Sequence, residues 1–310
     1  MIKYVCLWLL LIGPAAASVL VRSPGGGATA VVTVSGGAVL WSVRFRGAPV
    51  IDPAPIGLVF ADNPSAPLAV GSITRTTRDL RVTGLIGKTS TARDQYREAT
   101  IRFAAASGRP ALDFIVRAYD DGAAYRWAVR SQRPFRLMVE RADFGMPDTA
   151  QAWAMPVKGF DSSYEEYYRS GPLARTLPHG QLIALPLLFH RGPVWAAITE
   201  AALHDWAGLY LTRRGGAPGM SSRLSPRLDD PGMIVRGHAG VHLSRWRLVI
   251  VGDAPGRLVE SNLVTVLNPP PTVKDWSWVK PGKTVFPWWN DYYWPGAPFK
   301  PGLNTATYLA

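Results

Sequence analysis

The sequence predicts an all-β protein built as a sandwich of short strands. Short apolar runs, some alternating with period two, recur at regular intervals without long helical patterns between them. Glycine and proline are frequent, with 30 and 27 in 310 residues, and charged residues make up only 18%. This composition favours a turn-rich β protein over a helical one. Strands at such regular spacing are typical of a sandwich.

Two hairpins give the clearest local signals. Residues 30–34 and 39–45 are strand-like arms joined by a Gly36-Gly37 turn. Residues 112–119 and 124–129 form a second pair around a turn at 120–122. Further strands are expected at 49–51, 99–104, 135–139, 152–155, 183–189, 194–199, 208–212 and 246–251.

The pattern changes near the end of the predicted sandwich. A short helix is expected at residues 255–263, with Asp253 near its N-cap. Asn268 and three prolines follow, which remove backbone donors and hold a chain extended. We therefore expect a leader at 1–17, the β domain at 18–271, and a linker with the start of a second domain at 272–310.

The last segment predicts the opening of a β/α unit. Residues 284–289 are expected to form a buried strand, 302–305 a turn with an N-cap, and 306–310 the first turn of a helix. We expect the chain to stop inside this unit.

The first seventeen residues predict an export signal. Lys3 is followed by an apolar run at 5–12 and by the small residues 15–17. The run is too short to span a bilayer; a buried first strand is the alternative. Cys6 lies within the signal, so the mature chain would contain no cysteine. We expect a periplasmic or secreted protein with no transmembrane segment after cleavage.

The net charge is +12, which raises the possibility of an anionic partner. However, the basic residues are scattered, and Arg213-Arg214 is the densest pair. A solvated basic surface is the favoured interpretation, and we expect no binding to nucleic acid. The five histidines show no zinc-like spacing, and no phosphate loop or nucleophile elbow is present.

Two acidic positions are candidate metal ligands. Glu165 lies in the tyrosine-rich segment 161–168, which could give oxygen ligands to calcium, bind sugar hydroxyls, or be a plain exposed loop. Glu200 follows the apolar strand 194–198, and a carboxylate leaving a buried strand is costly unless it is paired or binds a metal. Glu200 is therefore the stronger candidate.

Other residues are candidates for contact with a saccharide. Ser221, Ser222 and Arg223 lie in a Gly/Pro-rich stretch predicted to be a loop that could reach a ligand or only connect strands. Trp288 and Trp289 belong to an aromatic stretch, and sugar rings stack on such side chains. Packing between two domains is the alternative for these tryptophans.

Seven motifs in order give the sequence a family resemblance. They are PAPIGL at 53–58, RAYDDGAAYR at 117–126, YEEY at 164–167, LPLL at 185–188, ITEAAL at 198–203, NPP at 268–270 and SWVKPGK at 277–283. Together they resemble glycoside hydrolase family 97. The sequence departs from the family pattern at Ala202, where Asp is common, and at Phe286, where Trp is common.

The resemblance implies a β-super-sandwich of the galactose-mutarotase type, followed by a truncated first β/α unit of a (β/α)8 barrel. It implies an α-glucosidase or α-galactosidase that uses calcium, with Glu200 as the ligand lent by the sandwich. The family's catalytic acid, its base or nucleophile and most calcium ligands lie on later barrel strands.

Two functions remain open at this point. The first is the N-terminal portion of an exported calcium-dependent α-glycosidase acting on an oligosaccharide or α-glycoside, inactive by itself and monomeric or homodimeric when complete. The second is a stand-alone, non-catalytic carbohydrate-binding β-sandwich. Retention or inversion and glucose or galactose preference are not decided by these residues.

Overall fold

The computed structural model describes residues 16–62, 67–83, 88–104 and 109–270, with positions 272, 273, 275, 277–280, 282 and 283. The chain divides into two compact units at Pro269 and Pro270. The first unit is almost entirely antiparallel β structure, so the predicted all-β class is confirmed. The expected barrel strand and helix at 284–310 lie outside the described residues. No helix in the described part of the chain has the length and apolar character needed to cross a membrane.

The smaller sheet has six strands, in the order β1-β2-β3-β4-β9-β16. Both predicted arms of the first hairpin are present here, paired from Ala28↔Phe45 to Ser35↔Ala38. The strands are β1 (Ala17–Arg22), β2 (Ala28–Ser35), β3 (Ala38–Phe45), β4 (Ala48–Phe60), β9 (Phe135–Ala142) and β16 (Val235–Gly237).

The larger sheet has twelve strands, with the main order β11-β10-β12-β13-β18-β8-β7-β6-β5; β14 pairs with β12 and β15, and β17 pairs with β8. Its strands are β5 (Val70–Thr83), β6 (Thr91–Phe103), β7 (Ala111–Tyr119), β8 (Gly122–Ser131), β10 (Gln151–Val157), β11 (Arg169–Pro172), β12 (Leu182–Arg191), β13 (Val194–Ala201), β14 (Leu209–Arg213), β15 (Met220–Leu224), β17 (Gly240–Leu243) and β18 (Trp246–Gly252). Within the described chain, β5 is an edge strand whose residues are mostly exposed.

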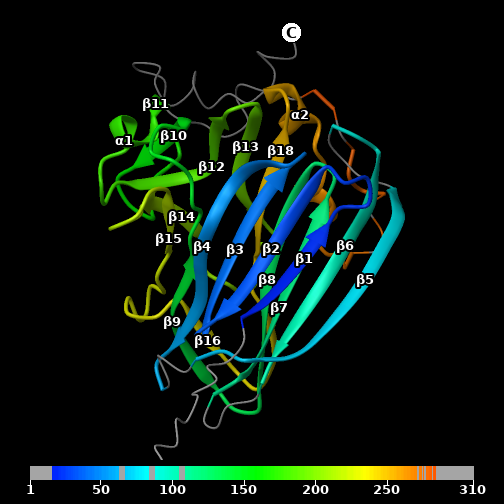
Figure 1. The fold of residues 1–310 in the computed structure, drawn as a ribbon, viewed down its shortest axis with the longest axis vertical. Helices are drawn as coiled ribbons and strands as arrows, with labels where there is room; N and C mark the ends of the chain where they lie inside the picture. Colours follow the sequence, from blue (N-terminus) through cyan, green and yellow to red (C-terminus); the bar gives the residue numbers. More distant parts are fainter. Residues whose placement is uncertain are drawn as a thin grey trace, which may run out of the picture. The chain divides into compact units, whose positions relative to one another are not determined.

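The main core lies between the two sheets. In Figure 1, β1–β3 lie in front of β6–β8, and the inward residues of both layers are apolar. Trp41 of β3 packs edge-on against Tyr125 of β8, with ring centroids 4.6 Å apart. Both rings are almost completely buried, so burial of large aromatic side chains is the main force that holds the layers together.

A second apolar cluster covers the opposite face of the larger sheet. Leu248 and Ile250 of β18 pack there with Leu263 of α3 (Leu263–Val266). The expected helix at 255–263 is present as two shorter pieces, α2 (Pro255–Glu260) and α3, and α1 (Leu173–Thr176) is the remaining helix in the described chain. Asp253 directly precedes the N-cap residue of α2, which is Ala254 and makes no side-chain cap, because alanine has no acceptor.

Candidate functional site

Glu200 lies near the end of β13, at the centre of the larger sheet. It pairs with Arg247 of β18 in the strand register, and Ala201↔Trp246 is the last pair. Residues that follow the ladder are free to turn away from the sheet. The strand therefore carries the Glu200 carboxylate to the boundary between the core and solvent, where its side chain is 12% exposed.

The Glu200 carboxylate is held by three donors. Arg245 Nη1 donates to Oε1 at 2.7 Å, and Arg247 Nη1 donates to Oε2 at 2.6 Å. The backbone N–H of Leu209 also donates to Oε2, at 3.3 Å. A carboxylate has about four lone-pair positions. One acceptor position on Oε1 therefore stays open to a cation or a hydroxyl group, as judged from the described donors.

Arg247 joins Glu200 to a second carboxylate, Glu140 of β9. Arg247 Nε and Nη2 donate to the two oxygens of Glu140 at 2.7 and 2.6 Å, and Trp206 Nε1 donates to Oε2 at 2.6 Å. The side chains of Glu140 and Arg247 are fully buried. Desolvation opposes the charge of Arg247, but Glu140 and Glu200 outweigh it and raise the pKa of this guanidinium. The arrangement fixes the orientation of Glu200.

The tyrosine-rich loop packs against Tyr210, the residue after Leu209, whose N–H donates to Glu200. Tyr210 of β14 donates its hydroxyl to Phe160 O at 3.2 Å, and its ring centroid is 6.0 Å from that of Tyr164. Desolvation, the Tyr210 hydroxyl and the negative charge of Glu200 raise the pKa of Tyr164, so its hydroxyl stays protonated. The Tyr164 residue is 44% exposed. It can therefore donate a hydrogen bond and offer a ring surface next to the carboxylate.

Backbone strain is concentrated around this carboxylate. In the described chain, four residues other than glycine have a left-handed φ: Arg46, Tyr164, Ala202 and Asp205. Three of them, with φ of 61°, 57° and 38°, lie in the tyrosine-rich loop or in the loop after Glu200. Such conformations cost about 1–3 kcal/mol each and cluster at functional sites. This supports the choice of Glu200 as the centre of the candidate site.

A cavity of about 800 Å³ adjoins the network through Arg245, Trp206 and Gly208. His204 and Asp205 also line it, and both are exposed. The loop that follows Glu200 thus forms one wall of this cavity, and Arg245, which donates to Glu200, forms another part of the lining.

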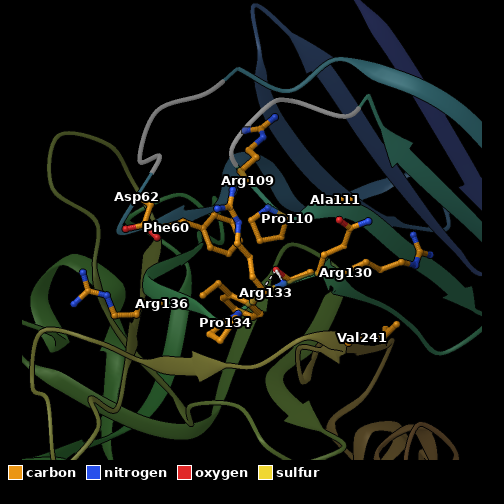
Figure 2. Close-up of a pocket in the computed structure, with 14 residues that line it drawn as sticks. Phe60, Asp62, Arg109, Pro110, Ala111, Arg130, Arg133, Pro134, Arg136 and Val241 are labelled. Carbon is orange, nitrogen blue, oxygen red and sulfur yellow. Dashed lines mark hydrogen bonds between the residues drawn. The ribbon is translucent and has the colours of Figure 1, made fainter.

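A different cavity of about 700 Å³ lies around Phe60, Pro110 and Pro134 (Figure 2). In Figure 2 Arg130 and Arg136 extend to opposite sides of it, so their charges do not converge on one point. Arg130 is moreover paired with Asp113. None of the site residues expected from the sequence lines this cavity, and we place the candidate site at Glu200.

The structure corrects the expected loop at 221–223. Ser221, Ser222 and Arg223 lie in strand β15, because tertiary pairing with β14 overrides the flanking glycine and proline signals. Ser222 Oγ donates to Glu140 O at 2.8 Å and accepts from Ala142 N at 2.9 Å. Its hydroxyl therefore has a structural role. Arg223 is exposed and lies across from Tyr210 in the ladder.

The remaining expected site residues are less closely connected. Glu165 is exposed in the loop next to Tyr164, whereas the neighbouring Glu166 pairs with Lys158 at 3.3 Å. Trp288 and Trp289 lie outside the described residues. Roles for these residues in binding a saccharide or calcium stay predictions.

Sequence reasoning missed the groups that hold Glu200. The available signal was the pattern Arg245-Trp246-Arg247 at the start of an apolar strand, because a charged residue in a buried strand requires a partner. That partner, Glu140, is more than one hundred residues away in the sequence. Only the pairing of the two sheets brings these charges together.

The described residues do not form a complete calcium site. Calcium takes six to eight oxygen ligands, and no group of three or more His, Cys, Asp or Glu in the described chain could hold a metal. Glu200 offers one open acceptor position, and two guanidinium groups lie beside it. Within the described residues, Glu200 could therefore give at most one ligand to a cation.

Comparisons with known proteins agree on one family. The sequence model of Glycosyl-hydrolase 97 N-terminal matches residues 21–270. A retaining α-galactosidase of Bacteroides thetaiotaomicron is 30% identical over 93% of this chain and 46% of its own length. A probable retaining α-galactosidase of Streptomyces bingchenggensis is 26% identical over the same shares. The chain thus spans about half the length of these relatives.

A solved structure gives the same result. A family 97 enzyme of Pseudoalteromonas sp. strain K8, in complex with acarbose, superposes with a TM-score of 0.76 at 26% identity, over 85% of this chain and 40% of that chain. Another structure of that enzyme, an E480Q form, contains panose with the same score and coverage. The two antiparallel sheets, the family match and the relatives agree, and the chain belongs to glycoside hydrolase family 97, with residues 21–270 matching its N-terminal domain.

Proposed function

We propose that this chain is the N-terminal part of a calcium-dependent α-glycosidase and that Glu200 is its contribution to the calcium site. The observation that carries the proposal is the Glu200 carboxylate, fixed by Arg245, Arg247 and the Leu209 N–H with one acceptor position open. Calcium prefers carboxylate oxygens, and a fixed ligand reduces the entropy lost when an ion binds.

The substrate is an oligosaccharide or another α-glycoside. The curated relatives are named as α-galactosidases, and the Pseudoalteromonas enzyme was solved with acarbose and panose. Glycosidases cleave such bonds with a pair of carboxyl groups; in this proposal those groups lie outside the described residues, and residues 1–310 do not hydrolyse substrate alone. Tyr164 is available to contact a sugar ring next to Glu200. We further propose export to the periplasm or the medium, and a monomeric or homodimeric enzyme.

Terbium tests the role of Glu200. This ion can replace calcium in a protein site, and when it is bound it emits light after a nearby tyrosine side chain transfers energy to it. Tyr164 and Tyr210 lie beside the carboxylate. We expect tyrosine-sensitised emission that calcium competes away and that Glu200→Gln abolishes. Glu260→Gln is the control and keeps the signal, because Glu260 is exposed and pairs with Arg257. Emission that is equal in wild type and Glu200→Gln refutes the proposal.

The proposed lack of hydrolysis has its own test. The purified chain is incubated with nitrophenyl α-galactoside and nitrophenyl α-glucoside, with and without calcium. We expect no release of nitrophenol above the buffer rate. Hydrolysis that follows the protein through purification contradicts the assignment of the catalytic carboxyl groups to another part of the enzyme.

Non-catalytic saccharide binding is a second candidate, favoured by the exposure of three tyrosines in one loop. Tyr164, Tyr167 and Tyr168 are 44%, 92% and 57% exposed. Exposed aromatic rings in such a loop are typical of sugar-binding surfaces. Calorimetry with panose distinguishes this function: binding without calcium that Tyr164→Ala weakens supports it, and no heat of binding rejects it.

A further inference from the structure

The loop after Glu200 needs an acceptor for one buried N–H group. The β13 ladder ends at Ala201, and Ala202 turns into a left-handed conformation with φ of 57°. Ala202 is only 8% exposed, and a buried N–H without a partner costs free energy comparable to a lost hydrogen bond. Asn268 supplies the acceptor: its Oδ1 lies 3.1 Å from Ala202 N.

Asn268 is itself fixed to the helical segment before it. Its Nδ2 donates to Val264 O of α3 at 2.6 Å. Leu263 and Leu267 are buried in the apolar cluster that includes Ala201 and Ala202. One amide side chain therefore bonds to α3 on one side and to the loop after Glu200 on the other.

The position of Asn268 in the chain gives this contact its significance. Pro269 and Pro270 follow it, and the first compact unit ends between them. Proline holds the chain extended and offers no N–H of its own. The Asn268 side chain thus forms a hydrogen bond between the last residues of the first unit and a residue two positions after Glu200.

We propose that Asn268 is a positioning residue for Glu200. It fixes the left-handed turn at Ala202, and it couples the direction of the Glu200 carboxylate to the segment that leaves the sandwich. This inference rests on the proposed role of Glu200 as a cation ligand. The acceptor oxygen carries the effect on the loop, so aspartate keeps an acceptor for Ala202 N–H but loses the Nδ2 bond to Val264 O, whereas alanine removes both bonds.

Hydrogen exchange of the whole 310-residue chain tests the contact directly. A net hydrogen bond contributes about 1 kcal/mol, which is about a fivefold change in an opening equilibrium. We expect Asn268→Ala to speed exchange about fivefold in peptides covering residues 201–208, without a change in β7 or β8. Asn268→Asp keeps the acceptor for Ala202 N–H but loses the bond to Val264 O, so its exchange is expected to be slower than that of Asn268→Ala. Asn262→Ala is the matched control, since Asn262 accepts from Thr89 instead.

Terbium emission provides the functional readout. We expect Asn268→Ala to weaken terbium affinity about fivefold and Asn268→Asp to restore part of it, because aspartate keeps only the acceptor for Ala202 N–H. Unchanged exchange at 201–208 in Asn268→Ala overturns the inference, as does Asn268→Asp exchanging as fast as Asn268→Ala. If terbium affinity is unchanged in Asn268→Ala while emission is lost in Glu200→Gln, the positioning role of Asn268 is rejected and the proposed role of Glu200 stands. Emission that survives Glu200→Gln rejects the proposed function, while the exchange result still decides whether the contact holds the loop.

Discussion

Replacing Glu140 by glutamine measures how strongly the buried charge network stabilises the sandwich. Glu140 accepts three hydrogen bonds, two from Arg247 and one from Trp206, at 2.6–2.7 Å. Glutamine has the same shape but only one acceptor oxygen, and its NH₂ group would face a donor. The substitution also removes the negative charge from a fully buried pair.

The expected decrease in the free energy of unfolding follows from this geometry. Breaking a buried ion pair by removing one partner costs about 3–5 kcal/mol, because the other charge stays buried. Glu200 still neutralises Arg247 through its 2.6 Å contact, so we expect the lower end, about 3 kcal/mol. For a domain of this size each kcal/mol lowers Tm by about 2–4 °C, which gives a fall of about 6–12 °C for Glu140→Gln.

Thermal unfolding followed by circular dichroism is the assay. Asp79→Asn is the control: Asp79 and Arg93 also approach to 2.6 Å, but both side chains are largely exposed. Solvent and salt weaken such a pair, so Tm is expected to stay within error. A fall of less than 2 °C in Glu140→Gln, or an equal fall in Asp79→Asn, would show that burial does not determine the contribution of these pairs.

Three further substitutions test separate features. Burial lowers the pKa of Arg126 to about 10. Its Nε is buried without a hydrogen-bond partner, although the guanidinium lies 4.3 Å from the centroid of the Trp246 ring. We expect the desolvation cost to exceed this contact, so that Arg126→Met raises Tm at neutral pH, with a gain that shrinks above about pH 10 as the wild-type side chain loses its proton. Trp206→Phe keeps an aromatic side chain but removes the indole N–H that donates to Glu140. Urea unfolding is expected to show that the free energy of unfolding falls by about 2 kcal/mol. Ala202→Gly relieves the left-handed φ and raises stability by about 0.5–1 kcal/mol in the same assay. An unchanged Tm in Arg126→Met, or an unchanged free energy of unfolding in Trp206→Phe or Ala202→Gly, refutes the argument made for that variant.

Local signals were sufficient for much of the sandwich. The turn at Gly36-Gly37 and the apolar arms around it predicted the β2–β3 hairpin, because both residues have the left-handed φ that favours glycine. The turn signal at 120–122 predicted β7 and β8; Asp120 and Asp121 form the turn, and Gly122 begins β8. In such segments the contacts that decide the structure lie close together in the sequence.

The site depended on information that is not local. The sequence showed that Glu200 needed a partner, and the structure supplies Arg245 and Arg247. Which partner it would be was decided by the antiparallel register of β13 and β18. The strand at 221–223 was missed for a similar reason: its pairing with β14 outweighs the turn-forming residues on both sides. The predicted calcium and sugar contacts of Glu165, Trp288 and Trp289 remain predictions.

The long edge strand β5, cyan at the right of Figure 1, has a consequence for the solubility of the protein. Among the described residues, its outer side has no partner strand along fourteen residues, and such an edge can pair with the same strand of another molecule and begin an aggregate. Arg78, Asp79 and Arg81 place charges along this strand, and the net charge of +12 makes two copies repel each other. The scattered arginines thus disfavour self-association of the chain through charge repulsion. This repulsion weakens as added salt shortens its range.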